Sequence, residues 1–321
     1  MRVRVRPAFR AAGLVAGTVL AACAALTVAA PPALSSAAAA ARPATARLAA
    51  VTRVAGPAGP AGPAGVRAKA AAVADAATGR LLWSRDPNAE RPMGSITKVM
   101  TALVVIEAGH LDRTVTVPYA VTGYVEEHDA SSAGLVPGDR LTAAQLLEAL
   151  LLPSGADAAY ALAVAYGPGL GAFVAKMNAT ARRLGLTRTH FSNFDGLPWP
   201  TEYSTYSTAA NLITLGRAAM RSPVFRAIVD RRSYRVAAGS GHHAYLWDNT
   251  NPLLGAYPGA IGIKTGFTRA AGDCLLFEAT RHGRSVIGVT LDSPGVGTTV
   301  NGADATRVLD WAFSHAAGAA G

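Results

Sequence analysis

The sequence predicts an α+β fold in which an α/β part is joined to an all-helical subdomain. Strand-like runs bounded by turns occur near both ends of the folded region, over 70–85 and 260–291. Between them, over 143–184, apolar residues recur with the 3.6-residue period of helices. Strands from the two ends, with a helix expected over 303–315, would form one part and the middle helices the other. We expect a functional site in the cleft between them.

Residues 1–68 precede the predicted folded domain. Residues 1–10 carry positive charges and 11–41 carry none, which is the layout of a secretory signal. We therefore expect a signal peptide or a retained N-terminal anchor over 1–41. Residues 42–68 are rich in Ala, Pro and Gly and are expected to form a linker, because this composition buries too little surface to offset the entropy of ordering. The folded domain is expected over 69–316.

The N-terminal segment also predicts export, to the extracytoplasmic cell envelope or beyond it, with a membrane tether if the segment is retained. Leu20-Ala21-Ala22-Cys23 offers an alternative, because it is similar to the lipobox in which the cysteine is lipidated. The apolar residues that follow it argue against lipidation. Only Cys274 remains in the folded part, so an internal disulfide is excluded, which is consistent with a bacterial envelope protein.

Composition narrows the choice of partners. Hydrophobic residues make up 50% of the chain and charged residues 16%, which is enough for a large globular core. The formal net charge is +10, but no basic stripe alternates with aromatic side chains, so we do not expect a nucleic acid partner. Anionic wall polymers and the extracytoplasmic membrane surface suit a basic protein better.

In the first half of the chain, strands are expected over 70–75 and 81–85, because their apolar runs flank a turn that contains Gly79. A helix is expected from Ser95 to Ala108, because apolar residues recur there every three or four positions. A short strand over 114–117 begins an irregular segment that extends to Leu141. Thr142 is expected to cap the first of four further helices, over 143–152, 158–166, 173–184 and 208–220.

In the second half, four further strands are expected, over 233–236, 260–267, 274–280 and 285–291. The last three are joined by turns that contain glycine, so we expect them to pair antiparallel. A helix over 303–315 completes the folded part. The tail from residue 303 onward has no apolar run long enough to span a membrane.

Ser95-Ile96-Thr97-Lys98 places a hydroxyl and an amine three positions apart. On a helix these positions are neighbours, so the Ser95 hydroxyl can hydrogen bond to the Lys98 amine. Only four of the 30 basic residues are lysines, and Lys98 and Lys264 are two of them. Because an arginine keeps its proton in a protein whereas a buried lysine can lose it, these lysines suit acid–base chemistry. Taken alone, Ser95 could equally be a helix cap and Lys98 a solvated residue.

Two further motifs follow along the chain. Ser154-Gly155-Ala156 lies in a turn between two predicted helices, where a plain helix C-cap is the alternative interpretation. Lys264-Thr265-Gly266 lies inside a predicted strand. A Ser-x-x-Lys, a Ser-containing turn and a Lys-Thr-Gly together are the signature of penicillin-binding proteins and class A β-lactamases. Their order and their settings here argue against coincidence.

With these motifs, the sequence from about 72 to 312 resembles the serine-type D-alanyl-D-alanine carboxypeptidases, which are low-molecular-weight penicillin-binding proteins. Further matches are Asp75-Ala76-Ala77-Thr78-Gly79, Met100-Thr101-Ala102, Asn193-Phe194-Asp195-Gly196-Leu197 and Asn249-Thr250-Asn251. The resemblance implies a β-lactamase/transpeptidase-like fold, with a five-stranded, mostly antiparallel sheet flanked by helices, and makes 69–316 the catalytic domain. It also implies peptidoglycan pentapeptides as substrates and β-lactams as inhibitors. We expect a monomer that needs no cofactor and no metal.

The resemblance assigns the acylation chemistry to named residues. Ser95 would be the acylated nucleophile, and Lys98 would be its general base if Lys264 and the helix N-terminus lower the pKa of Lys98. Ser154 would relay a proton to the leaving amine. The backbone N–H groups of Ser95 and Phe267 would hold the oxyanion of the tetrahedral intermediate.

The resemblance also assigns substrate binding. Lys264 and Thr265 would receive the terminal carboxylate of the peptide, because an anionic end needs both a cation and a hydroxyl. The strand edge that includes Gly266, Phe267 and Thr268 would pair with the substrate backbone.

The chain departs from the family pattern at two places. Ala156 stands where the family usually has an asparagine that contacts the substrate, which predicts weaker peptide binding or altered specificity. No basic residue occurs over 292–302, where family members often carry an arginine that helps to bind the carboxylate. His242 and His243 lack partners at metal-site spacing and are expected on the surface, and Cys274 is expected to be a buried strand residue.

Two other functions stay open. A class A-like β-lactamase shares the motifs but needs a glutamate that activates the deacylating water, and the helical half holds no Glu-x-x-Leu-Asn sequence. A catalytically weak wall-binding relative is the second alternative, because Ala156 replaces a substrate contact. The sequence does not decide between hydrolysis and transpeptidation.

Overall fold

The computed structural model describes residues 61–295 and 302–315. These residues lie within Pro57–Gly321, the second of two compact units of the chain. The predicted signal or anchor over 1–41, and the predicted linker before residue 61, lie outside the described residues. The boundaries of leader, linker and catalytic domain therefore stay predictions. Within the predicted linker, Val66 and Ala68 are buried in a core beneath the last helix.

Five strands form one antiparallel sheet, in the order β2-β1-β9-β8-β7. The strands are β1 (Ala70–Asp75), β2 (Leu81–Arg85), β7 (Ala260–Thr268), β8 (Gly272–Arg281) and β9 (Arg284–Ser293). Segments from the two ends of the folded chain pair directly, since Ala72 of β1 lies opposite Val289 of β9. The predicted α+β fold and its antiparallel sheet are confirmed. Because β7 is the last strand at one edge of this sheet, its outer side offers backbone groups to a peptide.

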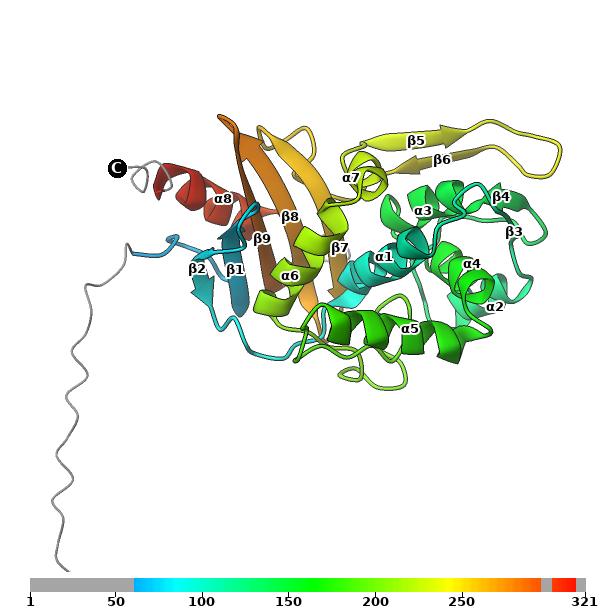
Figure 1. The fold of residues 1–321 in the computed structure, drawn as a ribbon, viewed down its shortest axis with the longest axis horizontal. Helices are drawn as coiled ribbons and strands as arrows, with labels where there is room; N and C mark the ends of the chain where they lie inside the picture. The colour runs from blue at the N-terminus through cyan, green and yellow to red at the C-terminus, as the bar shows by residue number, and fades with distance from the viewer. Residues whose placement is uncertain (1–60, 296–301, 316–321) are drawn as a thin grey trace, which may run out of the picture. The chain divides into compact units, whose positions relative to one another are not determined.

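Alternation along the strands divides the sheet between two hydrophobic cores. Ala71 and Val73 of β1 pack in the core beneath α8 (Ala303–His315), whereas Ala72 belongs to the opposite core. That opposite face is covered by α6 (Ala209–Met220), and Figure 1 shows the sheet between the two helices. Small alanines on β1 let both helices approach the sheet closely.

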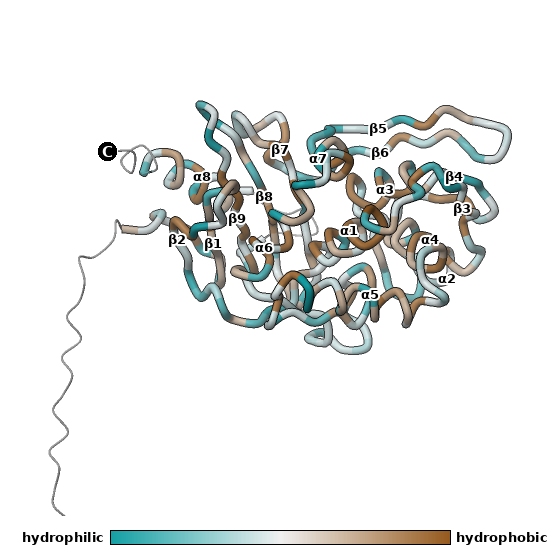
Figure 2. The backbone as a smooth tube through the Cα atoms, viewed as in Figure 1, coloured by the Kyte–Doolittle hydropathy of each residue, from teal (hydrophilic) through white to brown (hydrophobic). Residues whose placement is uncertain are grey.

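The other helices form the helical part of the fold. They are α1 (Lys98–Ala108), α2 (Ala120–Glu127), α3 (Ala143–Leu151), α4 (Ala156–Tyr166), α5 (Leu170–Arg183) and α7 (Pro223–Val229). Helix α1 contacts α3, α4, α5 and α6, so it joins this part to the sheet. Figure 2 shows α1 and α4 as largely hydrophobic, which agrees with their central position. Thr142 caps α3 as predicted, because its hydroxyl accepts a hydrogen bond from the backbone N–H of Gln145.

Two further sheets, each of two antiparallel strands, accompany the helices. They are β3 (Thr114–Thr116) with β4 (Arg140–Thr142), and β5 (Ser233–Val236) with β6 (Tyr245–Asp248). In Figure 1 the strands β5 and β6 extend beside α3 and α7.

Four elements were not predicted, namely α2, α7, β4 and β6. Helix α2 buries only Val121 and so presents no apolar stripe. Helix α7 spans seven residues, too few for a helical period, although Ser222 caps it and Pro223 opens it. In β6 the buried Tyr245 and Trp247 alternate with exposed residues, a strand signal hidden in a turn-rich segment.

Within the described ranges, no single helix is long and apolar enough to cross a membrane. Helices α4 and α5 are long and apolar enough only when taken together, and the chain bends by 90° at the break between them.

Candidate active site

Ser95 and Lys98 lie where two helix types meet. Gly94–Thr97 forms a 3₁₀ helix, η1, and the α-helix α1 begins only at Lys98, so the prediction of one continuous α-helix from Ser95 is wrong in its first turn. Side chains three positions apart eclipse one another in a 3₁₀ helix. Lys98 Nζ accordingly donates a hydrogen bond to Ser95 Oγ at 2.9 Å. Ser95 is half-buried whereas Lys98 has no exposed surface, so solvent reaches the hydroxyl side of the pair.

Two glycines let η1 pack directly against the backbone of β7. A Cβ atom on Gly266 would lie 2.3 Å from the Met93 carbonyl oxygen, and one on Gly94 would lie 2.7 Å from Phe267 N. Gly94 also has a φ of +52°, which favours glycine. The close packing brings the predicted site residues Ser95, Gly266 and Phe267 together, with their backbones side by side.

Burial dominates the acid–base behaviour of Lys98. It lowers the pKa of Lys98 from 10.5 to about 8, while the carboxylates of Asp195 and Asp157 raise it. Burial also lowers the pKa of Lys264 well below its usual value, and the nearby charge of Lys98 adds to that effect. The pKa of Lys98 is therefore lowered as expected, but the main cause is burial. It is not the charge of Lys264 or a helix N-terminus, which were the expected causes.

Asp195 is a part of the site to which the sequence analysis assigned no role. Its side chain is fully buried, and its Oδ2 accepts a hydrogen bond from Tyr124 Oη at 2.8 Å. Its Oδ1 accepts a second hydrogen bond from the backbone N–H of Leu197 at 3.2 Å. Burial raises the pKa of Asp195, and the charge of Lys98 lowers it.

The residues on either side of Asp195 hold it beside the start of α1. Thr101 Oγ1 donates a hydrogen bond to the carbonyl of Phe194. Gly196 has a φ of +86°, and a Cβ atom on it would lie 2.0 Å from the Gly94 carbonyl oxygen. The sequence signal for this contact is the Asn193–Leu197 match to the family. The match alone does not say what Asp195 does.

Asp157 is the second carboxylate that acts on Lys98. It is buried in the first turn of α4 and accepts hydrogen bonds from the backbone N–H groups of Ala133 and Leu135, each at 3.0 Å. Ser132 Oγ donates another at 2.7 Å. Asp157 therefore fastens the 131–135 loop to α4, directly after the Ser154-Gly155-Ala156 turn.

Ser154 occupies a strained turn that is held from both sides by Ser131. Its φ is +67°, in a region that non-glycine residues adopt only where the surrounding structure holds them. Ser131 Oγ donates a hydrogen bond to the Ser154 carbonyl at 2.6 Å, and the Ser131 carbonyl accepts one from Ala156 N at 2.8 Å. Within the described part of the chain, no hydrogen bond joins Ser154 Oγ to Ser95 or Lys98. The structure therefore fixes the turn without linking its hydroxyl to the pair.

Lys264 and Thr265 form a second polar group, on β7. Lys264 is 1% exposed, and its Nζ donates hydrogen bonds to the Thr265 carbonyl at 3.1 Å and to Thr265 Oγ1 at 3.2 Å. Thr265 Oγ1 also lies 2.7 Å from Thr250 Oγ1, a contact that explains why the 249–251 segment belongs with the site. Thr268 differs from the others, because its Oγ1 accepts a hydrogen bond from Ala271 N and so shapes the β7–β8 turn.

The two departures from the family pattern have different surroundings. Ala156 is fully buried at the first position of α4, where it presents a methyl group. Asp292, at the start of the stretch without basic residues, receives two cations from elsewhere in the chain. Its Oδ2 lies 3.0 Å from Lys69 Nζ and 3.1 Å from Arg91 Nη1.

Among the residues that the structure describes, no group of three or more His, Cys, Asp or Glu side chains could hold a metal ion.

The predicted surface position of His243 is confirmed, because its side chain is 66% exposed. Its Nδ1 lies 3.0 Å from the carboxylate of Asp139. The prediction for Cys274 is also confirmed, since it is a buried free thiol in β8.

Comparison with known proteins agrees with this geometry. A family described as D-alanyl-D-alanine carboxypeptidase matches residues 57–295. The D-alanyl-D-alanine carboxypeptidase of Streptomyces sp. strain K15 is 41% identical over 249 residues, which cover 74% of this chain and 84% of that protein. D-alanyl-D-alanine carboxypeptidase DacB2 of Mycobacterium tuberculosis is 40% identical over 243 residues, 75% of this chain and 81% of that one. The crystal structure of the Streptomyces K15 DD-transpeptidase has a TM-score of 0.72 at 39% identity, and the match covers 78% of this chain and 98% of that one.

Proposed function

The chain belongs to the D-alanyl-D-alanine carboxypeptidase family, and we propose that it removes the terminal D-alanine from peptidoglycan stem peptides through an acyl-enzyme on Ser95. The observation that carries this proposal is the 2.9 Å hydrogen bond from Lys98 Nζ to Ser95 Oγ, made by a lysine that is fully buried and has a pKa of about 8. A buried amine with a lowered pKa is a competent general base near neutral pH.

In the acylation step, Ser95 Oγ attacks the carbonyl carbon of the penultimate D-alanine while its proton passes to Lys98 Nζ. The oxyanion that forms is stabilised by the backbone N–H groups of Ser95 and Phe267, which the close packing of Gly94 against β7 supports. The intermediate collapses, the C–N bond breaks, and the leaving D-alanine takes the proton from Lys98 by way of the Ser154 hydroxyl. The product is an ester between Ser95 and the shortened stem peptide.

The terminal carboxylate of the substrate is assigned to Lys264 and Thr265. Burial holds the pKa of Lys264 well below its usual value in the free protein, so an arriving carboxylate would favour the charged ammonium form. The hydroxyl of Thr265 supplies the second donor once it turns from its neighbour Thr250. The outer edge of β7, with Gly266, is assigned to the backbone of the peptide.

Transfer of the acyl group to an amine is the second candidate reaction. It is favoured by the likeness to the structure named as the Streptomyces K15 DD-transpeptidase. Both reactions share the Ser95 ester and differ only in whether water or an amine attacks it. Following the charge pattern of residues 1–41, we also assign the protein to the extracytoplasmic envelope. We treat it as a monomer.

Release of D-alanine from a synthetic pentapeptide tests the proposed function. The wild-type protein should release D-alanine, whereas Ser95→Ala and Lys98→Met should each lower kcat/KM at least about 1,000-fold, the scale on which removal of a nucleophile or its base acts. Adding glycine as an acceptor separates transfer from hydrolysis by the product formed.

Benzylpenicillin serves as the discriminating substrate. A slowly released acyl-enzyme supports the peptidase, whereas hydrolysis of benzylpenicillin at many turnovers per second would establish the β-lactamase alternative. If neither compound reacts, the wall-binding alternative replaces the proposal.

A further inference from the structure

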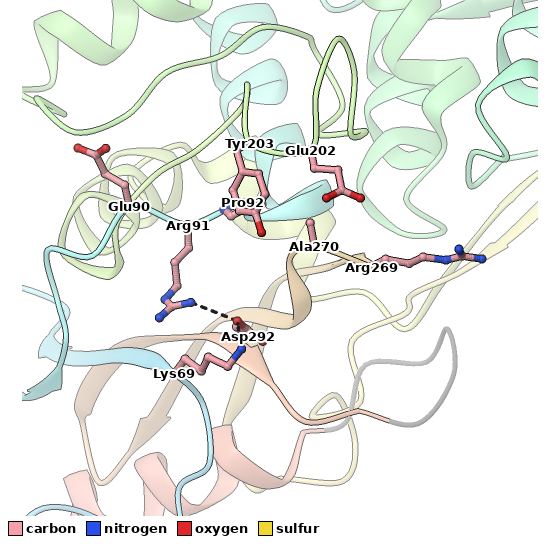
Figure 3. Close-up of a pocket in the computed structure, with 9 residues that line it drawn as sticks. All are labelled: Lys69, Glu90, Arg91, Pro92, Glu202, Tyr203, Arg269, Ala270 and Asp292. Atoms are coloured by element: carbon pink, nitrogen blue, oxygen red, sulfur yellow. Dashed lines mark hydrogen bonds and ion pairs between the residues drawn. The ribbon is translucent and has the colours of Figure 1, made fainter.

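A cavity of about 420 Å³ opens beside the C-terminal end of β7. Arg269 and Ala270, which follow directly after Thr268, line one side of it. Arg91, four positions before Ser95, lines another side. Figure 3 shows Tyr203 and Glu202 reaching into the space from the opposite loop, with Arg91 directed towards Asp292. The cavity therefore adjoins the strand that carries the candidate site.

The walls carry both signs of charge in equal number, with three cations (Lys69, Arg91, Arg269) and three carboxylates (Glu90, Glu202, Asp292). Two of the cations are already paired, because Asp292 binds Lys69 and Nη1 of Arg91. At the outer end, Arg269 and Glu202 are exposed and form no ion pair with another described residue. The mouth thus offers one cation and one carboxylate to a ligand.

The proposed function fixes the direction in which a stem peptide passes this cavity. Its terminal carboxylate is assigned to Thr265 and its reacting carbonyl to Phe267 N, so the donor chain runs along β7 from Thr265 towards Thr268. An extended peptide advances about 3.3 Å per residue, the same as the strand beside it. The residue that precedes the penultimate D-alanine, the third residue of the stem, therefore lies beside Thr268 and Arg269, at the mouth of the cavity.

We propose that this cavity binds the side chain of the third stem residue, and that it selects a side chain ending in an amino-carboxylate group, as in a diamino dicarboxylic acid. The proposal rests on the proposed function, because that function sets the direction of the peptide. Arg269 would pair with the carboxylate of the side chain and Glu202 with its ammonium group. A side chain that ends in an amine alone pairs with Glu202 but leaves Arg269 unpaired, and a neutral alkyl chain leaves both charges unpaired.

Three pentapeptides that differ only in the third residue test the proposal. Their side chains end in an amino-carboxylate (2,6-diaminoheptanedioic acid), an amine (lysine) or a methyl group (norleucine). The wild-type kcat/KM should be about tenfold higher for the first peptide than for norleucine, as one or two charge-assisted hydrogen bonds allow. Arg269→Ala and Glu202→Ala should each reduce this preference to about twofold. The control Arg182→Ala, an exposed arginine on α5, should leave it unchanged.

Two further measurements separate this proposal from the function on which it rests. The rate at which benzylpenicillin acylates Ser95 should be the same in Arg269→Ala as in the wild type, because the phenylacetamido group, which stands in place of the third stem residue, carries no charge for Arg269 to bind. Calorimetry gives the Kd of each of the three peptides for the Ser95→Ala variant, and so measures the contribution of the cavity to binding without any turnover. Equal kcat/KM and equal Kd for the three peptides, or a preference that survives both variants, would overturn the cavity assignment while acylation stays intact. Loss of acylation in the wild type would instead contradict the proposed function.

Discussion

Lys98 can act as the general base of the site because burial and nearby carboxylates change the pKa of its amine in opposite directions. Complete burial lowers its pKa to about 8, and Asp195 and Asp157 keep it from falling further. A lysine with no such carboxylates would be neutral over a wider pH range but would hold the proton from Ser95 less firmly. Lys98 and the two buried aspartates thus form one electrostatic group of opposite charges, while Lys264 adds a like charge beside Lys98.

Asp195→Asn should move the pH dependence of acylation to lower pH. The base form of Lys98 increases as pH rises through its pKa, so the wild-type acylation rate should be half-maximal near pH 8 and reach its plateau about one pH unit higher. Removing a carboxylate that raises this pKa should shift the rising limb downward by about one pH unit. Stopped-flow acylation by benzylpenicillin from pH 5 to 10 measures the limb, with Asp230→Asn, an exposed aspartate, as the matched control. A limb that stays in place would show that Asp195 does not act on Lys98.

Sequence reasoning could find Ser95 and Lys98 because three positions along one chain segment determine their proximity. It could also find Lys264 and Thr265, because Lys-Thr-Gly in a strand is a local pattern. It gave no role to Asp195, which is remote from Lys98 in the chain and reaches it through tertiary contacts, the packing of Gly196 against Gly94 and the hydrogen bond from Thr101 to the Phe194 carbonyl. Electrostatic partners of this kind depend on tertiary contacts that no local spacing records.

At the scale of elements, the contact between η1 and β7 positions the nucleophile. The two backbones approach so closely at Gly266 that the Met93 carbonyl oxygen occupies the place of a side chain. A strand and a helix that both carried side chains at this contact would stand further apart. The position of Ser95 beside Phe267 N therefore depends on glycine at both Gly94 and Gly266.

Gly266→Ala should displace η1 from β7. The added methyl group meets backbone atoms that cannot rotate away, so we expect a loss of about 1–3 kcal/mol in the free energy of unfolding and at least a tenfold slower acylation. The control is Gly171→Ala on α5, where a Cβ atom meets nothing within 4 Å and where alanine suits a helix. Urea unfolding and acylation by benzylpenicillin measure both effects. A Gly266→Ala protein that acylates at the wild-type rate would contradict the requirement for close packing.

For the whole molecule, the pairing of β1 with β9 brings the two ends of the folded chain into one sheet, and α1 connects that sheet to the helices. This arrangement was predictable because strand signals lay at both ends and helical periods in the middle. The short elements α2 and α7 were not, since α2 buries a single residue and α7 spans only seven. The loops around Ser131 and Asn193, which have no regular period, place the two carboxylates and the Ser154 turn around α1.

The mass of the intact protein after exposure to benzylpenicillin tests the central claim most directly. The wild-type protein should gain the mass of one penicilloyl group, peptide mapping should place that group on Ser95, and Lys98→Met should acquire it far more slowly. Ser95→Ala should gain nothing. A wild-type protein that gains no mass, or a Ser95→Ala protein that gains as much as the wild type, would contradict the assignment of Ser95 as the acylated nucleophile.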